Sequence, residues 1–297
     1  MYWDTFAKPV PLEELGWVNT VYLGTGTSVW DPMIVWGTTV ETEPLEKFLV
    51  ECRQSHELMV SPAHVLVNAV AQSLKQHPKM NRRVIWNRVY QYKTVNVIMP
   101  MMQTRAGEVD SVFLRGADEL SLAEISQRFW SEARDKAVRV AEAEKTRQSA
   151  GLLRRALGAV GRRIHLRSLH TMAWMAFVIA NRWRVPTVLM AQQELNGGNA
   201  FVNYLGFRGA PPLISFKPSC LPMNSYSVNV TLGASEPRPV VIDGDIVIRR
   251  QAPLYIRFDH RMVNIYEAAA FINTLRSYLA EPWKMAQYEK PPMRNAA

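Results

Sequence analysis

The sequence predicts a single α+β domain, and three observations lead to this fold class. Hydrophobic residues make up 48% of the 297 residues and charged residues 21%, a composition that fits a folded protein and not a disordered chain. Patterns typical of helices and of strands are mixed without the regular alternation that marks a parallel α/β sheet. The sequence contains no internal repeat and no low-complexity linker. We therefore expect one domain over residues 1–297.

The first half of the chain contains several short apolar segments that predict strands. Val35 to Val40 is the first, and a helix follows it from about Pro44. Further strand patterns occupy residues 84–86, 89–90, 95–99 and 109–114.

Two helices of this half carry clear start signals. Ser61-Pro62 precedes apolar residues at helical spacing between Val65 and Leu74, and serine followed by proline is typical of a helix start. His77-Pro78 predicts the end of that helix. Ser121 to Glu124 has the pattern of a capping box, and the helical pattern after it continues toward Glu144.

The second half of the chain contains strands, a hairpin and a final helix. Strand patterns occupy residues 201–205, 240–242, 246–248 and 254–258, and a helical pattern occupies residues 267–279. Gly197-Gly198 breaks the chain before the first of these strands. Asp243-Gly244 lies between the second and the third, which is a strong signal for a β-hairpin. Pro282 follows the last helix.

The excess of positive charge is local. The chain has 35 Lys and Arg against 26 Asp and Glu, a formal net charge of +9, but residues 145–193 hold nine cations and no carboxylate. The rest of the chain is formally neutral. Overall basicity therefore gives no argument for nucleic acid, and we expect no nucleic-acid partner.

Cysteine content and the apolar segments bear on the compartment. Only Cys52 and Cys220 occur, which argues against a disulfide framework and favours a reducing compartment. The N-terminus lacks a basic segment followed by an apolar run, so we expect no signal peptide. The longest uncharged apolar stretch, residues 168–181, has 14 residues and falls short of the ~20 that span a bilayer. We therefore expect a cytoplasmic protein.

His260 is the histidine whose position points to chemistry. It directly follows the apolar strand 254–258 and precedes the last helix, so its ring can be held at a strand end beside a cleft. The other histidines lie on or beside ordinary helices or in the basic stretch: His56, His64, His77, His165 and His170. No pair has the spacing of a zinc hydrolase, and we expect no metal site. A nucleophile elbow and a phosphate-binding glycine loop are also absent from the sequence.

Several segments carry a family resemblance. They are Asp-His-Arg with its following helix and proline at residues 258–282, the hairpin at 237–248, Leu-Asn-Gly-Gly at 195–198 followed by Gly206, the strand and capped helix at 107–133, and the helix at 61–81 that ends in His-Pro-x-x-Asn. In this order they resemble the acyltransferase component of 2-oxoacid dehydrogenase complexes, which shares its fold with chloramphenicol acetyltransferase.

The resemblance implies a mixed sheet with flanking helices, a homotrimer with active sites between subunits, and acyl-CoA as the co-substrate. It implies that His260 is the general base that removes a proton from an acceptor thiol or hydroxyl, a role that suits imidazole with its pKa near ~6.5. Asn203 stands where the family has a serine that donates a hydrogen bond to the oxyanion. Asn264 stands where the family has an aspartate that supports the local fold. Ile265 replaces a glycine, so we expect the loop after His260 to differ.

Residues 138–196 form a predicted insertion, because the family connects the same elements with a shorter segment. Two helices are expected in it, one cationic and amphipathic around Leu152 and one apolar from about Trp174. Four interpretations stay open: packing within the assembly, a lid over a hydrophobic acyl substrate, contact of residues 145–193 with a membrane surface, and contact with the phosphates of coenzyme A or with an acidic carrier protein.

The sequence therefore predicts an acyltransferase that moves an acyl group from acyl-CoA or a carrier-protein thioester to a small-molecule acceptor, in secondary or lipid metabolism. Because the resemblance begins near the N-terminus, we expect no lipoyl domain before this core. Two alternatives stay open. One is a non-catalytic scaffold of the same fold, which the changes at Asn203, Asn264 and Ile265 motivate. The other is a condensation reaction that uses His260.

Overall fold

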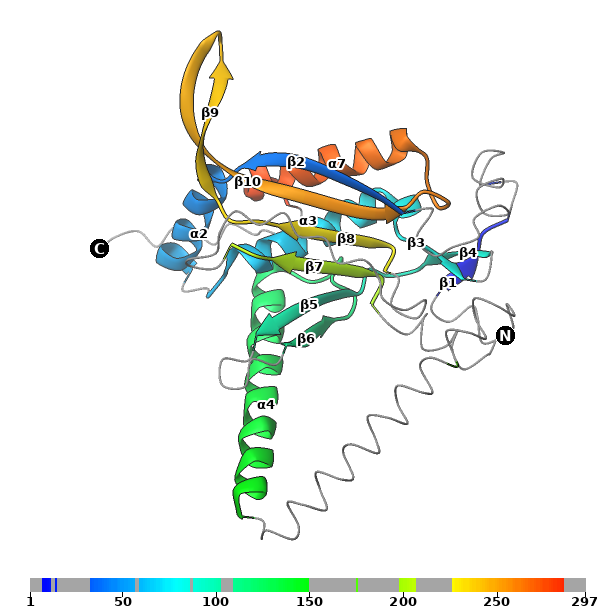
Figure 1. The fold of residues 1–297 in the computed structure, drawn as a ribbon, viewed down its shortest axis with the longest axis vertical. Coiled ribbons are helices and arrows are strands. Elements are labelled where there is room, and N and C mark those ends of the chain that lie inside the picture. The colour runs from blue at the N-terminus through cyan, green and yellow to red at the C-terminus, as the bar shows by residue number, and fades with distance from the viewer. Residues whose placement is uncertain are drawn as a thin grey trace.

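The computed structural model describes residues 7–11, 14, 33–56, 59–85, 88–102, 109–149, 175, 198–206 and 226–285 (Figure 1). Within these ranges the chain forms a larger mixed sheet with helices against one of its faces, and a smaller sheet at one end. Most of the predicted insertion lies outside the described residues, as does Gly197. Of the two helices expected in the insertion, only Met175 is described, and it is helical.

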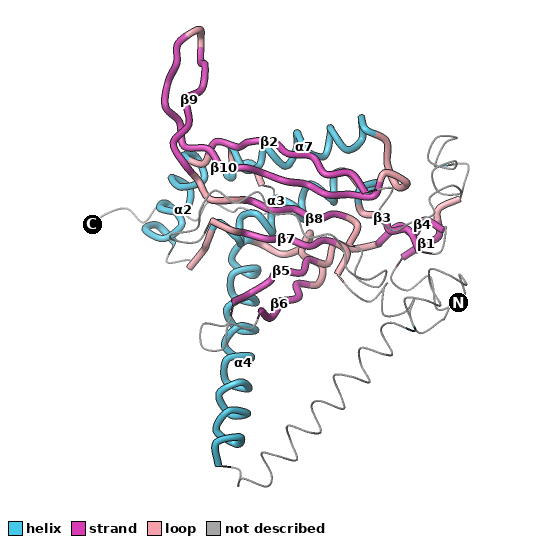
Figure 2. Tube along the Cα trace, in the orientation of Figure 1, coloured by secondary structure: helices cyan, strands magenta, loops and turns pink. Residues whose placement is uncertain are grey.

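The larger sheet is mixed. Its strands are β2 (Met33–Glu41), β5 (Val97–Met102), β6 (Val109–Leu114), β7 (Ala200–Tyr204), β8 (Val228–Leu232), β9 (Glu236–Ile242) and β10 (Asp245–Asp259). Six of them run in the order β2, β10, β8, β7, β5, β6, and β9 pairs with the first part of β10 (Figure 2). β7 pairs in parallel with β5 and with β8, whereas the other pairings within this sheet are antiparallel.

The smaller sheet and the helices complete the described fold. The smaller sheet has the order β1 (Ala7–Pro9), β4 (Arg88–Tyr92), β3 (Arg82–Ile85). The helices are α2 (Glu43–His56), α3 (Pro62–Gln76), α4 (Leu122–Ser149) and α7 (Ile265–Ala280), with short 3₁₀ helices at Pro78–Met80 and Pro282–Lys284. This arrangement confirms the predicted α+β fold class.

The core lies between the larger sheet and the helices. Leu254, Ile256 and Phe258 of β10 are buried in one continuous cluster with apolar residues of α2, α3 and α7. Since side chains alternate along a strand, Tyr255 and Arg257 lie on the opposite side. We call this opposite side, which also carries Asn203 and Asn229, the second face of the sheet.

The predicted hairpin is confirmed, and it projects from the body of the protein (Figure 1). Asp243 and Gly244 have φ values of 53° and 93°, the left-handed conformation that a two-residue hairpin turn requires. β10 continues from this turn to Asp259 as one strand, whereas the sequence suggested separate strands at 246–248 and 254–258. The joining residues 249–253 read Arg-Arg-Gln-Ala-Pro, so they show no apolar alternation that would link the two predicted strands.

Helix boundaries follow the predicted start signals. Glu124 and Ser121 exchange the two hydrogen bonds of a capping box, with N–O distances of 2.8 and 3.2 Å. α4 runs from there over 28 residues, about 42 Å at 1.5 Å per residue, and extends well past the sheet (Figure 1). α7 begins at Ile265, two residues before the predicted start at Glu267.

Neither a membrane span nor a metal site is found among the described residues. None of the helices in these ranges is long and apolar enough to cross a bilayer. Within the same ranges, no three His, Cys, Asp or Glu side chains gather as a metal site would require.

Candidate active site

His260 lies in the turn between β10 and α7. Phe258 on one side and Met262 and Val263 on the other are buried in the core, so the backbone is anchored just before and just after the histidine. His260 itself is only partly covered. The backbone of this turn is therefore held in place by the core, whereas the side chain of His260 is partly exposed.

A backbone hydrogen bond sets the tautomer of His260. Its Nδ1 lies 2.9 Å from the carbonyl oxygen of Val263. A carbonyl oxygen only accepts hydrogen bonds, so Nδ1 must carry the proton in this contact. In the neutral ring Nε2 then carries a lone pair and can accept a proton.

Asp259 and Arg261 form a buried ion pair on either side of His260. Arg261 Nε lies 3.0 Å from Asp259 Oδ1, and Arg261 Nη2 lies 2.6 Å from Oδ2. The backbone N–H of Arg261 also donates to Oδ1 over 2.9 Å. Both side chains are buried. This two-residue clamp fixes the direction in which the chain leaves β10, and with it the base of the His260 side chain.

Asn264 is the N-cap of α7. Its Oδ1 accepts a hydrogen bond from the backbone N–H of Glu267 over 2.9 Å, and Glu267 Oε2 accepts one from the N–H of Asn264 over 3.2 Å. Ile265 is the first helical residue, and Asp243 is the only described non-glycine residue with positive φ. The turn after His260 thus requires no glycine, because the helix begins at the residue where the family has one.

Asn203 lies on β7, on the second face of the sheet. Its neighbour Val202 is fully buried in the core, so alternation turns Asn203 away from the helices. Asn203 pairs with Thr231 of β8, and Thr231 pairs with Tyr255 of β10. These three residues form a row across the sheet, and Gly37 of β2 continues it. A Cβ at Gly37 would lie 2.9 Å from the Tyr255 ring, so a larger residue at position 37 would collide with that ring.

The structure does not bring Asn203 and His260 together within one chain. Asn203 lies two strands away from β10 and level with Tyr255, five residues before His260. At about 3.3 Å per residue and about 4.8 Å per strand, the two residues are about 19 Å apart. An oxyanion donor must lie about 3 Å from the reacting oxygen. Within one chain, therefore, these two residues do not serve the same carbonyl group.

A buried amide network, which the sequence analysis missed, fixes the strands beneath the site. Asn199 Nδ2 donates to Asn81 Oδ1 over 2.6 Å and to the carbonyl oxygen of Thr94 over 2.8 Å. Asn199 Oδ1 accepts from the N–H of Asn96 over 2.6 Å. The network joins the residues that precede β5 and β7. The available signals were the asparagine of His-Pro-x-x-Asn and the asparagine directly after Gly-Gly.

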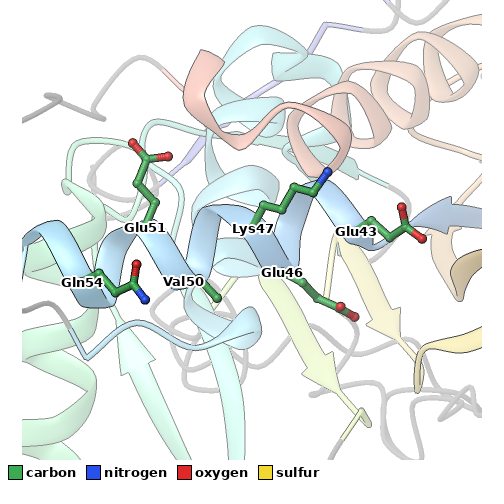
Figure 3. A pocket seen from close by; sticks show the side chains of 6 residues that line it. All are labelled: Glu43, Glu46, Lys47, Val50, Glu51 and Gln54. Atoms are coloured by element: carbon green, nitrogen blue, oxygen red, sulfur yellow. The ribbon is translucent and has the colours of Figure 1, made fainter.

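A hollow on the exposed side of α2 does not coincide with these residues. Figure 3 shows its lining side chains, all from one helix: Glu43, Glu46, Lys47, Val50, Glu51 and Gln54. Two of its carboxylates have structural partners, since Arg250 Nε donates to Glu46 over 3.1 Å and Trp283 Nε1 donates to Glu51 over 2.9 Å. None of the predicted site residues lines this hollow, and we assign it no chemistry.

The chain matches the family described as the catalytic domain of the 2-oxoacid dehydrogenases acyltransferase, over residues 31–148 and 189–287. It belongs to that family. The acyltransferase match includes all three predicted site residues, Asn203, His260 and Asn264. Residues 149–188, the unmatched stretch between the two matched segments, lie inside the insertion predicted at 138–196, whose extent and role stay predictions.

Curated relatives of this acyltransferase family are distant. The chain is 33% identical over 95 residues to the lipoamide acyltransferase component of the branched-chain alpha-keto acid dehydrogenase complex of Pseudomonas putida, which covers 31% of the chain and 21% of that protein. It is 22% identical over 243 residues to the dihydrolipoyllysine-residue succinyltransferase component of the 2-oxoglutarate dehydrogenase complex of Haemophilus influenzae, with coverages of 81% and 44%. The chain thus spans less than half the length of these relatives.

Solved structures confirm the predicted fold. The dihydrolipoamide acetyltransferase of Azotobacter vinelandii superposes with a TM-score of 0.54 at 17% identity, covering 94% of this chain and 93% of that one. A chloramphenicol acetyltransferase superposes with a TM-score of 0.50 at 11% identity, with coverages of 92% and 99%. The mixed sheet with flanking helices is therefore the chloramphenicol acetyltransferase-like fold.

Proposed function

We propose that this protein transfers an acyl group from a thioester to a small-molecule acceptor, with His260 as the general base. The observation that carries the proposal is the hydrogen bond from His260 Nδ1 to the carbonyl oxygen of Val263, because it leaves Nε2 as the proton-accepting nitrogen. Membership of the acyltransferase family supports the reaction class.

The steps follow from this tautomer. His260 Nε2 takes the proton of the acceptor's thiol or hydroxyl while the sulfur or oxygen attacks the thioester carbonyl carbon. The carbonyl oxygen becomes an oxyanion. When the tetrahedral intermediate collapses, the carbon–sulfur bond of the donor breaks, and the leaving thiolate takes the proton back from the imidazolium. The ring ends as it began, and the sequence of steps requires no metal ion.

The oxyanion donor in this proposal is Asn203 of a second copy of the chain. An amide N–H can donate to an oxyanion, and the removal of such a donor costs about 10²–10³-fold in rate. Since Asn203 and His260 are about 19 Å apart within one chain, their joint action requires an interface. A homotrimer repeats one heterologous interface three times and closes, so it would supply three equivalent sites.

Asn264 is a positioning residue in this proposal. It caps the helix that follows the turn of His260, so it stabilises the position of the Val263 carbonyl group. The structure of the Azotobacter vinelandii dihydrolipoamide acetyltransferase concerns the role of a serine, a histidine and an asparagine in its catalytic mechanism, and that asparagine follows the histidine by four residues. His260 and Asn264 have the same spacing, which supports the assignment of Asn264 to the site.

The donor and setting are proposed from the sequence. Acyl-CoA or an acyl carrier-protein thioester is the donor, and a step of secondary or lipid metabolism in the cytoplasm is the setting. The cationic stretch 145–193 would meet the phosphates of coenzyme A, an acidic carrier protein or an anionic membrane surface.

A pair of histidine variants tests the mechanism. Acetyl-, butyryl- and succinyl-CoA are offered as donors with dihydrolipoamide, a dithiol, as the acceptor, and the acylated acceptor is measured by mass spectrometry. His260→Ala should lower kcat by at least about 10²-fold. The matched control is His77→Gln, since His77 is also partly covered but contacts Thr274 through its ring over 2.7 Å; it should leave kcat nearly unchanged. Parental turnover in His260→Ala would refute the proposal. A parent protein without turnover on any donor would favour the scaffold alternative.

A further inference from the structure

One peptide group links His260 to the helix that follows it. The carbonyl oxygen of Val263 accepts the hydrogen bond from His260 Nδ1 over 2.9 Å. The nitrogen of the same peptide group belongs to Asn264, and its N–H donates to Glu267 Oε2 over 3.2 Å. This peptide group is therefore held from both sides, by the imidazole at its oxygen and by a carboxylate at its N–H.

The carboxylate of Glu267 has a second partner on another element. Lys79, in the 3₁₀ helix that follows α3, places its ammonium nitrogen 2.5 Å from Glu267 Oε1. Burial lowers the pKa of the Arg82 guanidinium at the start of β3, and the negative charge of Glu267 opposes that effect in part. Lys79 thus binds the carboxylate directly, and Arg82 adds to the positive potential around it.

These contacts form one continuous chain of hydrogen bonds. It runs from the Lys79 ammonium group through both oxygens of Glu267, across the peptide group of Val263 and Asn264, to His260 Nδ1. Hydrogen bonds in such a chain polarise one another, so a peptide group whose N–H binds an anion carries more negative charge on its oxygen. The Val263 oxygen is therefore a stronger acceptor for the Nδ1 proton than the oxygen of an isolated peptide group.

The hydrogen-bond chain bears on the proton that His260 accepts in the proposed reaction. When Nε2 takes that proton the ring becomes a cation, and Nδ1 keeps its own proton and its hydrogen bond. The Glu267 carboxylate lies about 8 Å from the ring along this path, a distance at which an anion stabilises an imidazolium. Lys79, on the far side of the carboxylate, weakens this effect. Asp259 and Arg261, the charged neighbours of the histidine in the chain, bind each other and act on the ring with opposite signs.

We infer that Glu267 is a positioning residue for His260 that acts through the peptide group of Val263 and Asn264, and that Lys79 moderates its effect. In catalytic triads a carboxylate bonded directly to the histidine orients the ring and stabilises the imidazolium. Glu267 has this role here with a peptide group between the carboxylate and the ring. The inference rests on the proposed function for its effect on turnover, whereas the proton affinity of the ring is a property of the free protein.

Two variants that change charge separate this role from a merely structural one. Glu267→Gln keeps an oxygen that can close the capping box but removes the negative charge, whereas Lys79→Met keeps that charge and removes its counter-ion. Both lose the same ion pair, so a structural effect would act in one direction in both, but the charge on Glu267 acts on the imidazole in opposite directions. The pair is partly exposed, so its loss should leave the fold intact. The matched control is Glu281→Gln, which breaks the exposed pair with Lys284 at the other end of α7.

Hydrogen–deuterium exchange at the imidazole Cε1 position measures the protonation of His260 against pH without any substrate, when the peptide that holds this residue is followed by mass spectrometry. The midpoint of the titration should fall by about 0.3–0.5 pH unit in Glu267→Gln. It should rise by a smaller amount in Lys79→Met, stay at the parental value in Lys79→Arg and not move in Glu281→Gln. Shifts in the same direction in Glu267→Gln and Lys79→Met, or no shift in Glu267→Gln, overturn the inference.

Turnover relates the hydrogen-bond chain to the proposed reaction. With butyryl-CoA and dihydrolipoamide, the acid limb of the pH profile of kcat/KM should move to lower pH in Glu267→Gln and to higher pH in Lys79→Met, since a protonated His260 cannot act as the base. Parental turnover in His260→Ala would refute the proposed function and leave the exchange result standing. Parental exchange midpoints in both charge variants, together with turnover that depends on His260, would overturn this inference alone.

Discussion

The buried pair of Asp259 and Arg261 gives a prediction whose size follows from its geometry. Three N–H groups of Arg261 lie between 2.6 and 3.0 Å from the Asp259 carboxylate. Asp259→Asn keeps one oxygen for the backbone N–H but removes the negative charge. Arg261 then stays buried without its counter-charge, and the removal of one partner of a buried pair costs about 3–5 kcal/mol. For a chain of 297 residues that is a fall in Tm of about 5–8 °C.

Urea unfolding at pH 7 and calorimetry measure this loss. The control is Glu236→Gln, which breaks the exposed pair of Glu236 with Arg238 on the hairpin. That change should cost less than about 1 kcal/mol, because water screens an exposed pair. The double variant Asp259→Asn with Arg261→Met should recover part of the loss, since it removes the buried cation as well. A cost below about 1 kcal/mol for Asp259→Asn, or no recovery in the double variant, would show that the pair does not hold the turn of His260.

Three further predictions concern a buried histidine, a helix cap and the hairpin. Burial lowers the pKa of His64 from 6.5 to about 4, and its Nδ1 accepts the Ser61 N–H over 3.2 Å. Between these pH values the imidazole is protonated in the unfolded chain but neutral in the folded chain. The free energy of unfolding should therefore fall by about 3 kcal/mol as the pH falls from 6.5 to 4. In urea titrations at pH 5 and pH 7, His64→Gln should reduce this dependence on pH. Asn264→Ala should cost about 1 kcal/mol in thermal unfolding and lower kcat. Asn264→Asp should keep the cap, so that its stability and its kcat stay near those of the parent protein. An equal kcat in the parent and both variants would contradict the assignment of Asn264 to the site. Val241 and Ile246 are 72% and 76% exposed on one face of the hairpin, so Ile246→Lys should reduce the assembled mass in light scattering if that face packs on a second copy. Asp245→Lys, on the opposite face, is the control, and an unchanged mass in both variants would exclude the hairpin from the interface.

Local signals in the sequence predicted most of the secondary structure. Ser61-Pro62 and Asp243-Gly244 each fix their own conformation through caps or turn preferences, which depend on few neighbours. The same holds for His260, whose place after an apolar strand is a local property. α7 begins two residues before the predicted start at Glu267 because Asn264 is its N-cap. Asparagine followed three residues later by glutamate was a readable capping signal.

The sequence does not predict which strands pair with one another, or in which register. The amide network of Asn81 and Asn199 joins residues 118 positions apart, and no local pattern states which distant strand lies beside another. The separation of Asn203 and His260 is of the same kind, since it depends on the pairing of β7, β8 and β10. The position of Arg257 is predictable in part, because its side of the strand is a local property but its neighbours on other strands are not. A charged residue inside an apolar strand is visible in the sequence, and alternation with Ile256 and Phe258 already assigns it to the side away from the core.

The distance between the two predicted catalytic residues has a consequence for the alternatives. In a scaffold without catalysis, nothing would require the row of Asn203 on one copy to face the His260 turn of another. In the proposed enzyme, that contact is the site itself, so each copy contributes two half-sites at opposite ends of its own sheet. A mixture of His260→Ala and Asn203→Ala proteins would then regain one intact site in every mixed trimer, although neither variant alone has one. Recovery of turnover on mixing separates the two alternatives, and its absence in a mixture shown to exchange subunits would argue against a shared site.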